Sequence, residues 1–365
     1  MGTKFGGGNA SLFALQLSAI QEYRLYIQIE KDETDWDSFV ETSERATGYH
    51  RFRWKSIIGQ SFGHECYYLA AVDEAGVWRG VLPLVHMHSR LFGNFLVSVP
   101  FVNYGGLVCS DFQAARLLLD HAEHLRKSVQ ATHVELRHLG YSVEGFSSKE
   151  HKVTMILELA ANEETQWKGF NAKLRNQIRK AQKSGLEFVI GQIELLDGFY
   201  EVFARNMRDL GTPVYAKHFF QCVLTSFPDC TRVLAVYYEK RMIAAGIALW
   251  FRDVLEIPWA SSVGKYNALC PNNMLYWEAI KFALNNGFKK FDFGRSTPNE
   301  GTFNFKKQWG ALPVQLYWQY LLHEGRTIPH LSPSNPKYRA AIRVWKNLPV
   351  SLTKLLGPLI VQNIP

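Results

Sequence analysis

The sequence predicts an α/β (α+β) fold made of two similar domains, each a mixed, twisted β-sheet flanked by helices. The first observation is an internal repeat, because a helix, three strands, a second helix and a further strand occur twice in the same order. The second is the spacing of the copies: Phe227 and Leu234 follow Phe62 and Leu69 by the same 165 residues. Runs of antiparallel strands crossed by helices are typical of layered domains with a mixed sheet.

The elements of the repeat follow from the periodicity of apolar residues. Apolar residues at helical spacing predict the helices, and short apolar runs between turn residues predict the strands. The paired strands are residues 67–72 and 232–238, then 80–85 and 245–251, then the third strands that run into residues 99–101 and 257–259, and finally 133–136 and 289–293. The paired helices before the last strands are residues 114–129 and 272–285.

Length and composition agree with two folded domains. A chain of 365 residues can bury two cores of ordinary size, and 47% hydrophobic with 20% charged residues is a globular composition. The net charge of +8 predicts attraction to anions such as phosphates, nucleotides, tRNA or acidic lipid headgroups. The five cysteines are odd in number and form no CxxC pair, which favours reduced thiols in a cytoplasmic protein.

The sequence divides into four segments. Residues 1–23 contain three consecutive glycines and are expected to be a flexible lead-in, while residues 24–150 and 151–325 form the two domains. Residues 326–365 form a basic and apolar tail. No stretch approaches the ~20 consecutive apolar residues that a spanning helix needs, so no integral membrane segment is expected.

A basic helix is predicted at residues 162–185, where the second domain begins. Apolar residues from Trp167 to Ala181 recur every three or four positions and form one stripe. The opposite face is dense in cations and is either an anion-binding surface or a solvated helix face. Its proposed anion-binding residues are Lys173, Arg175, Arg179 and Lys180.

The tail mixes basic residues with leucines and is interrupted by prolines. Such a segment either docks on its own protein or lies on an anionic membrane surface, which would be the inner face of the membrane for a cytoplasmic protein. Docking on the protein is favoured, because prolines would interrupt an interfacial helix.

Two motifs near the end of the second copy resemble a known family. Residues 288–295 (FKKFDFGR) and 301–310 (GTFNFKKQWG) are similar to the C-terminal signature of FemAB-type transferases of the GNAT superfamily, and the resemblance extends over most of residues 49–322. Residues 173–185, 203–213 and 258–262, together with 271–277, resemble a bacterial subgroup found beside exosortase (PEP-CTERM) and exopolysaccharide genes.

The resemblance implies tandem GNAT-like domains and transfer of an activated acyl or aminoacyl group to an amine. Its setting implies a cell-envelope or exopolysaccharide precursor as acceptor. A simple GNAT enzyme binds the pyrophosphate of CoA at a glycine-rich turn before a helix, and the equivalent residues 269–273 (LCPNN) contain no glycine. The donor therefore stays open between acyl-CoA, an acyl-carrier protein and aminoacyl-tRNA.

The same motifs supply the candidate catalytic residues. Lys306 aligns with the family lysine and is expected to stabilise negative charge on an acyl-transfer intermediate, or else is an exposed lysine on an edge strand. Asp292 ends an apolar strand and would orient the amine or act as base. Arg295 would hold a phosphate or carboxylate, unless it only pairs with Asp292. Lys307 points away from Lys306 if the segment is extended and is a further substrate-binding candidate.

Four more residues are candidate substrate contacts. Asn272 and Asn273 begin a helix, and one of them is expected to be its N-cap. Asn103 and Tyr104 precede two glycines in the first copy, where either a substrate approaches the backbone or the chain simply turns. Histidines and cysteines lack metal-ligand spacing, so no metal site is expected.

These residues predict an acyltransferase that needs no covalent enzyme intermediate. Two alternatives stay open: a non-catalytic module that binds anionic glycan or nucleic acid through the basic helix, and a small-molecule N-acetyltransferase. The expected partners are the envelope or polysaccharide precursor and, depending on the donor, tRNA or an acyl-carrier protein.

Overall fold

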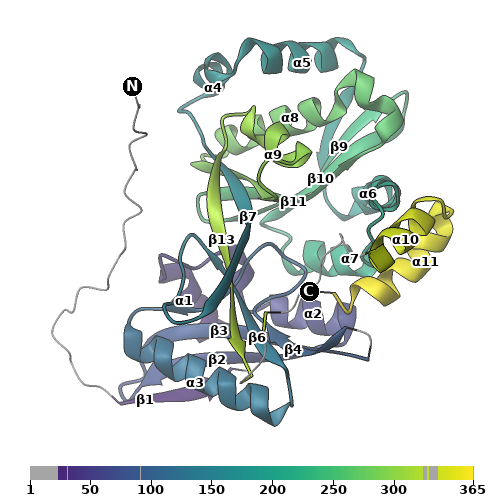
Figure 1. Cartoon of the computed structure of the whole chain (residues 1–365). Helices are drawn as coiled ribbons and strands as arrows, with labels where there is room; N and C mark the ends of the chain where they lie inside the picture. The colour runs from purple at the N-terminus through teal and green to yellow at the C-terminus, as the bar shows by residue number, and fades with distance from the viewer. Residues whose placement is uncertain (1–23, 31, 91, 324–326, 329–335, 365) are drawn as a thin grey trace, which may run out of the picture.

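The computed structural model describes residues 24–30, 32–90, 92–323, 327–328 and 336–364 (Figure 1). The lead-in expected at residues 1–23 and part of the tail lie outside the described residues. Within the described ranges the helices are α1 (Glu33–Thr42), α2 (Trp54–Phe62), α3 (Phe112–Ser128), α4 (Glu163–Gly169), α5 (Ala172–Lys183), α6 (Leu196–Leu210), α7 (Lys217–Ser226), α8 (Pro271–Asn285), α9 (Gly301–Lys307), α10 (Pro336–Lys346) and α11 (Val350–Val361), joined by short 3-10 turns.

Among the described residues, thirteen strands form one continuous sheet. A short strand, β5 (Val108–Cys109), pairs only with β3, and the other twelve follow one path across the molecule. Their spatial order is β1 (Leu25–Ile29), β2 (Glu65–Asp73), β3 (Trp78–Ser89), β4 (Gly93–Val97), β6 (His133–Leu139), β13 (Leu312–Leu322), β7 (Ser147–Glu158), β12 (Lys290–Ser296), β11 (Val254–Ser262), β10 (Arg241–Phe251), β9 (Thr231–Tyr238) and β8 (Glu187–Gly191).

The predicted repeat is present within this sheet. In the first half β2, β3 and β4 are antiparallel neighbours, and β4 pairs in parallel with β6 after the crossover helix α3. In the second half β9, β10 and β11 are antiparallel, and β11 pairs in parallel with β12 after α8. Strand β2 therefore has the place that β9 has in the other half, and the mixed sheets flanked by helices are confirmed.

The halves are joined by two long strands that change sides. Strand β7 follows β6 in the chain but pairs with β12, and β13 follows the second half but pairs with β6. The two strands also pair with each other over most of their length. The sheet is therefore continuous across both halves, and the division predicted between residues 150 and 151 runs through β7.

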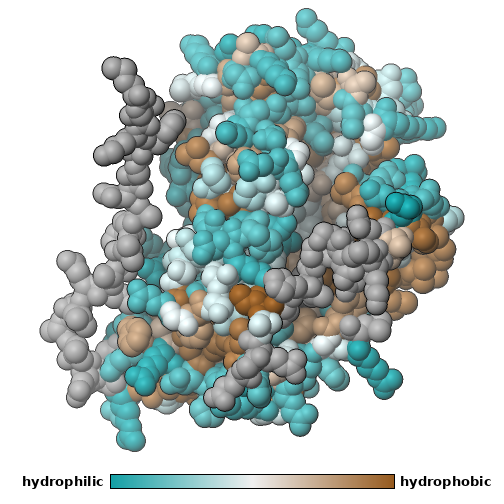
Figure 2. Space-filling view, in the orientation of Figure 1, coloured by the Kyte–Doolittle hydropathy of each residue, from teal (hydrophilic) through white to brown (hydrophobic). Residues whose placement is uncertain are grey.

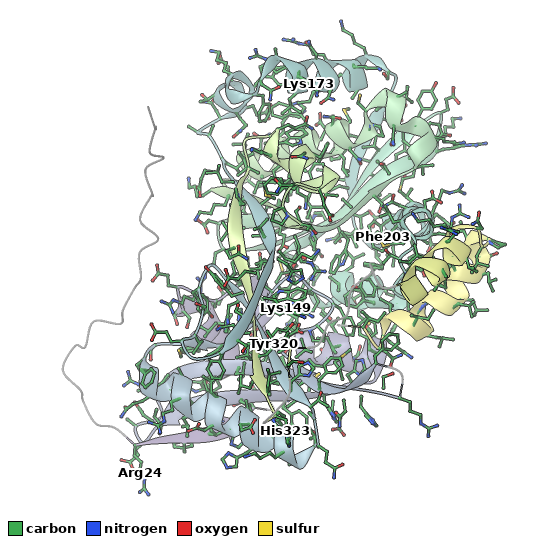
Figure 3. All side chains as sticks on the ribbon, in the orientation of Figure 1. Arg24, Lys149, Lys173, Phe203, Tyr320 and His323 are labelled. Atoms are coloured by element: carbon green, nitrogen blue, oxygen red, sulfur yellow. The ribbon has the colours of Figure 1, made fainter. Side chains whose placement is uncertain are left out.

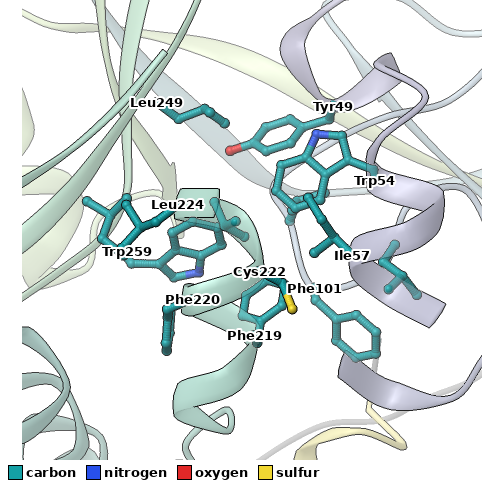
Figure 4. Close-up of a cluster of buried hydrophobic side chains, with 14 of the residues drawn as sticks. Tyr49, Trp54, Ile57, Phe101, Phe219, Phe220, Cys222, Leu224, Leu249 and Trp259 are labelled. Carbon is teal, nitrogen blue, oxygen red and sulfur yellow. The ribbon is translucent and has the colours of Figure 1, made fainter. Parts of the chain in front are cut away.

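A large aromatic core fills the space between the halves on one face of the sheet. Helix α2 of the first half packs against α7 of the second, and the ring centroids of Trp54 and Phe227 lie 5.6 Å apart. Those of Phe62 and Phe219 lie 5.2 Å apart. Figure 4 shows side chains of both halves meeting in this cluster, with Trp54 and Phe101 opposite Phe219 and Trp259. The core fixes how the two halves sit relative to one another.

The basic helix predicted at residues 162–185 is two helices, α4 and α5, so that prediction is wrong in its continuity. The chain is extended at Phe170, and the side chain of Asn171 caps α5 by accepting a hydrogen bond from the Leu174 amide. The apolar stripe survives the break: Phe170, Leu174 and Ile178 are buried. An N-capping side chain inside a continuing stripe is a break that apolar periodicity alone does not reveal.

The end of the described chain docks on the second half. Helices α10 and α11 pack on α6, and Trp345, Thr353 and Val361 are buried. Figure 2 shows hydrophobic residues gathered where Figure 1 places α11, beside hydrophilic residues of the neighbouring elements. Among the described residues, no helix is both long and apolar enough to cross a membrane.

Candidate active site

Two buried carboxylates lie side by side where the second half presents its parallel strands. Glu256 on β11 and Asp292 on β12 are register partners, so both side chains project from the same face of the sheet. Neighbouring residues such as Leu255 and Phe291 point to the opposite face and its core. Glu256 is 6% exposed and Asp292 is fully buried. Carboxylates are seldom buried in this way without a positive partner.

Hydrogen bonds from both halves hold the pair. Asp292 accepts from the Thr154 hydroxyl at 2.5 Å and from the Gly294 amide at 2.7 Å. Tyr104 donates to it at 2.9 Å, and its oxygen also lies 3.2 Å from Glu256. Asn103 donates to Glu256 at 2.5 Å. The candidate residues Asn103 and Tyr104 thus reach from the first half to carboxylates of the second.

The pair is held in a state that favours proton binding. Burial, followed by the negative charge of Asp292, raises the pKa of Glu256 to about 8, although Asn103 and Tyr104 donate to it. Burial likewise raises the pKa of Asp292, against hydrogen bonds from Thr154, Gly294 and Tyr104 and the attraction of Lys306. Two neighbouring buried carboxylates cannot both ionise cheaply, so the pair tends to keep one proton near neutral pH.

Lys306 lies behind the pair on α9. Its ammonium donates to the main-chain oxygens of Gly294 and Arg295 at 2.9 and 3.0 Å. Burial lowers its pKa to about 8, against the attraction of Asp292 and Glu256. The lysine therefore ties the helix to the end of β12 and places a cation near both carboxylates.

The edge-strand alternative for Lys306 and its neighbour is wrong, because the segment is helical. Lys306 is 8% exposed, whereas Lys307 at the end of α9 is exposed to solvent. In a helix neighbouring side chains diverge by about 100°, so the two lysines do not point in opposite directions as they would in a strand. The structure brings Lys306, but not the Lys307 side chain, next to the carboxylates.

A second group of charges lies on the same face of the sheet, on β6, β13 and β12, with β7 between the last two. The guanidinium groups of Arg137 and Arg295 lie over the ring of Trp318, at 4.5 and 5.4 Å from its centroid. Arg137 is 1% exposed and pairs with Glu135 at 2.7 Å, but its Nη2 atom has no hydrogen-bond partner. Arg295 is exposed, and the structure gives its guanidinium no ion pair within the described chain, so the expected pair with Asp292 is not formed.

A cavity of about 530 Å³ opens onto the carboxylates between the halves. The first half contributes the turn after α1, including Arg45 and Tyr49, and the second contributes the β10–β11 hairpin. Tyr49 is buried with its hydroxyl beside Glu256, outside hydrogen-bonding geometry. The cavity is large enough for the reacting parts of a small substrate, and Glu256, Asp292 and Tyr104 line its wall.

The remaining candidates lie elsewhere. The expected N-cap role of Asn272 or Asn273 is wrong, because Cys270, at φ 58°, occupies that position and neither asparagine side chain caps α8. Asn273 is buried with its amide 3.4 Å from Gln177 of α5, on the face of the sheet opposite the carboxylates. The basic residues Lys173, Arg179 and Lys180 are exposed and Arg175 is half-buried; Figure 3 shows Lys173 at the outer edge of the second half, far from Lys149 and Tyr320 on the central strands.

Sequence reasoning missed Glu256, Tyr49, Arg137 and Trp318. One signal was present, because Glu256 is the single charged residue inside an otherwise apolar strand. Its pairing with Asp292 depends on register between strands 36 residues apart, which no local pattern contains. Among the described residues no three His, Cys, Asp or Glu side chains come together as metal ligands.

Comparisons with known proteins bear on the fold and on the second half of the chain. A family model described as "Acetyltransferase (GNAT) domain" matches residues 168–307, a range that contains Glu256, Asp292 and Lys306. The crystal structure of FemX has a TM-score of 0.66 at 15% identity, covering 81% of this chain and 97% of FemX.

Two further structures share the arrangement. L-PGS from Bacillus licheniformis has a TM-score of 0.54 at 11% identity, covering 90% and 98% of the two chains. A tandem GNAT protein from the clavulanic acid biosynthesis pathway has a TM-score of 0.53 at 10% identity, covering 84% and 100%. At these identities the likeness establishes the tandem GNAT-like fold. No curated protein matches this chain by sequence.

Proposed function

We propose that this protein transfers an acyl or aminoacyl group from an activated donor to an amine, with Glu256 as the proton acceptor. The observation that carries the proposal is the buried Glu256–Asp292 pair, which has a raised affinity for protons and opens onto a cavity between the halves. A base whose pKa lies near the working pH is the most effective catalyst of proton transfer. The GNAT family match over the same residues supports the reaction class.

The reaction can be written with all atoms balanced. The neutral acceptor amine attacks the donor carbonyl and forms the C–N bond, while Glu256 accepts a proton from the attacking nitrogen. The C–S bond of a thioester or the C–O bond of an aminoacyl ester then breaks, and the proton passes from Glu256 to the leaving thiolate or alkoxide. Asn103 and Tyr104 hold the base in place by donating to it, and Thr154 holds the neighbouring Asp292. Lys306 supplies positive charge close to the reacting groups.

The acceptor is proposed to carry an anionic group beside the amine. Arg295 has no ion pair in the described chain and Arg137 keeps one unpaired nitrogen, and both lie over Trp318 on the face that holds the carboxylates. A phosphate or carboxylate there would satisfy these donors. Such a group fits the cell-envelope or exopolysaccharide precursor that the FemAB resemblance implies. The donor remains acyl-CoA, an acyl-carrier protein or aminoacyl-tRNA.

Binding and turnover together test the proposal. Native mass spectrometry of the protein with acetyl-CoA, acylated carrier protein and aminoacyl-tRNA in turn is expected to retain one of the three. That donor is then incubated with candidate amino sugars and amino-sugar phosphates, and the acylated product is measured for the parent protein and for Glu256→Gln. The expected result is donor binding by both proteins and transfer by the parent alone. Failure to bind any donor, or equal transfer by Glu256→Gln, would reject the proposal.

One observation favours a second candidate, a non-catalytic module that binds anionic glycan or nucleic acid. Helix α5 exposes Lys173, Arg179 and Lys180 on one side, and Arg179 lies 5.3 Å from the ring centroid of Trp167. A cation beside an aromatic ring is a common element of polyanion recognition. Under this alternative, polyanion binding would occur without any acyl transfer.

A further inference from the structure

Helix α11 has an outward face made of leucines. Leu352, Leu355 and Leu359 recur at helical spacing, and their side chains are 37%, 68% and 62% exposed. Figure 2 shows hydrophobic residues on the surface in the region where Figure 1 places α11. Large apolar side chains gathered on one exposed face mark an interaction surface, whereas single exposed leucines do not.

The opposite face of α11 is fixed against the protein, so the leucines cannot turn inward. Thr353, Gly357 and Val361 are buried. A Cβ atom at Gly357 would lie 2.8 Å from the backbone of Val214, which shows how closely the helix approaches the second half. Lys354 is held on the flank by an ion pair with Glu201. The exposed leucine face is therefore a fixed feature of the fold.

The charged residues of this segment itself all have one sign. Residues 336–364 contain five basic residues and no aspartate or glutamate. Arg343 and Lys346 in the last turn of α10 are exposed, and the structure gives neither a carboxylate partner among the described residues. Basic residues beside an exposed apolar helix face complement the negative surface of an anionic bilayer.

We propose that α10 and α11 dock this protein on the surface of a membrane rich in anionic phospholipid. The leucine face enters the boundary between headgroups and acyl chains, and Arg343 and Lys346 contact lipid phosphates. A helix of 12 residues is about 18 Å long, too short to cross a bilayer, so α11 lies in the plane of the interface. Pro358 lies inside α11 without interrupting the helix. The expected docking of the tail on its own protein therefore applies to the buried face of α11, and the leucine face is the one proposed to meet the membrane.

Vesicle sedimentation tests the apolar part of the surface. The full-length protein is mixed with vesicles of phosphatidylglycerol and phosphatidylcholine in equal parts, and with vesicles of phosphatidylcholine alone. Binding is expected to the first kind only, and the double variant Leu355→Asp/Leu359→Asp should lose at least tenfold in affinity. The control is Leu312→Asp, because Leu312 on β13 is as exposed as Leu355 and lies outside this face. An equal loss in the control, or no binding by the parent protein, overturns the proposal.

The basic residues give an independent test. Arg343→Gln/Lys346→Gln should weaken binding to the anionic vesicles by about fivefold for each residue removed and should reduce its salt dependence. A matched pair on α3, Arg116→Gln/Lys127→Gln, removes two exposed basic residues outside this face and should leave vesicle binding unchanged. If light scattering shows that the parent protein is a dimer in solution and that Leu355→Asp/Leu359→Asp is a monomer, the face is a contact between copies and the membrane proposal is wrong.

Discussion

Each half of this protein buries a glutamate on one of its two parallel strands, yet the two glutamates are treated in opposite ways. In the first half Glu135 lies beside Arg137, and although burial alone would raise its pKa, that cation holds the pKa below the ordinary value. In the second half Glu256 lies beside another acid, Asp292, and its pKa rises to about 8. In the first arrangement the negative charge of Glu135 is balanced by a cation. In the second, ionised Glu256 would face a like charge in the wall of a cavity. Under the proposed function, this difference assigns the chemistry to the second half and a supporting role to the first.

The chain beyond the parallel strands shows the same division. In the first half, the segment after β4 adopts left-handed backbone at Val99 and Phe101 and packs so closely that a Cβ atom at Gly106 would lie 2.5 Å from His138. This folded segment delivers Asn103 and Tyr104 to the carboxylates of the second half. The first half therefore contributes the segment after its third strand to the site, whereas the equivalent segment of the second half, residues 263–270, does not line the cavity.

The largest effect is expected at the glutamate of the second half. Glu256→Gln keeps the shape of the side chain but removes the base, so kcat for acyl transfer should fall about 10²- to 10⁴-fold. In the parent enzyme the rate should rise with pH and level off above about 8, because the base form of Glu256 accumulates there. The pH–rate profile of the variant should lack this rise. Glu158→Gln, the same change at an exposed site on β7, is the control.

The stability of the same variant sharpens the comparison. The unfolded chain releases the proton of Glu256 near its ordinary value of 4.5, whereas the folded protein keeps it to about 8. The folded state thus binds more protons within this window, and the free energy of unfolding should decline as pH rises from 4.5 to 8. In Glu256→Gln the decline should be smaller. Equal slopes in urea titrations of both proteins would contradict the carboxylate-pair description.

In the first half, breaking the Glu135–Arg137 ion pair should lower the folding stability. Arg137→Met leaves Glu135 buried without its cation, which typically costs about 3–5 kcal/mol of folding free energy. The double variant Arg137→Met/Glu135→Gln should recover most of that loss, because it removes both charges. Urea denaturation at pH 7 measures the stability loss in the single variant and its recovery in the double variant. If the single variant is as stable as the parent, Glu135 does not depend on Arg137.

How much of this contrast the sequence predicts depends on how local each feature is. The repeat, the strands and the crossover helices follow from apolar runs and turns, and they are present. The exchange of β7 and β13 was missed, since both strands alternate in the same way whichever half they join. Asp292 and Lys306 were predicted from their motifs. The place of Glu256 beside Asp292 depends on the pairing of β11 with β12, and that of Arg137 beside Trp318 on the pairing of β6 with β13. Features set by tertiary pairing leave little trace in the order of residues.

The next effect concerns the cation behind the carboxylates. Lys306→Met keeps most of the side-chain volume but removes a positive charge, and loss of such a stabilising group typically lowers kcat roughly a hundredfold to a thousandfold. Because Lys306 opposes the rise in the pKa of Asp292, the midpoint of the pH–rate profile should also move upward. A variant with the parental rate and an unchanged midpoint would show that the lysine only ties α9 to the end of β12.

A smaller effect should follow at the contact between the halves. Tyr104→Phe keeps the ring against Tyr49 and removes the hydroxyl that touches both carboxylates. Loss of one hydrogen bond to a charged group should lower kcat roughly tenfold, and the pKa of Glu256 should rise because a donor to its charged form is gone. A pH–rate profile identical to that of the parent would show that the first half does not tune the base.

The smallest effect on transfer is expected on α5, which belongs to the second half but lies on the far side of the sheet from the carboxylates. Reversing the charges of Lys173, Arg179 and Lys180 to glutamate alters exposed side chains that contact neither Glu256 nor Asp292. With a small donor, kcat should therefore stay at the parental value. Affinity for a polyanion such as tRNA should fall, and its dependence on salt should flatten, because each phosphate contact releases counterions. Unchanged affinity and salt slope would show that this face is only solvated, whereas a loss of kcat with the small donor would mean that the second half does not confine its chemistry to the face shared with the first.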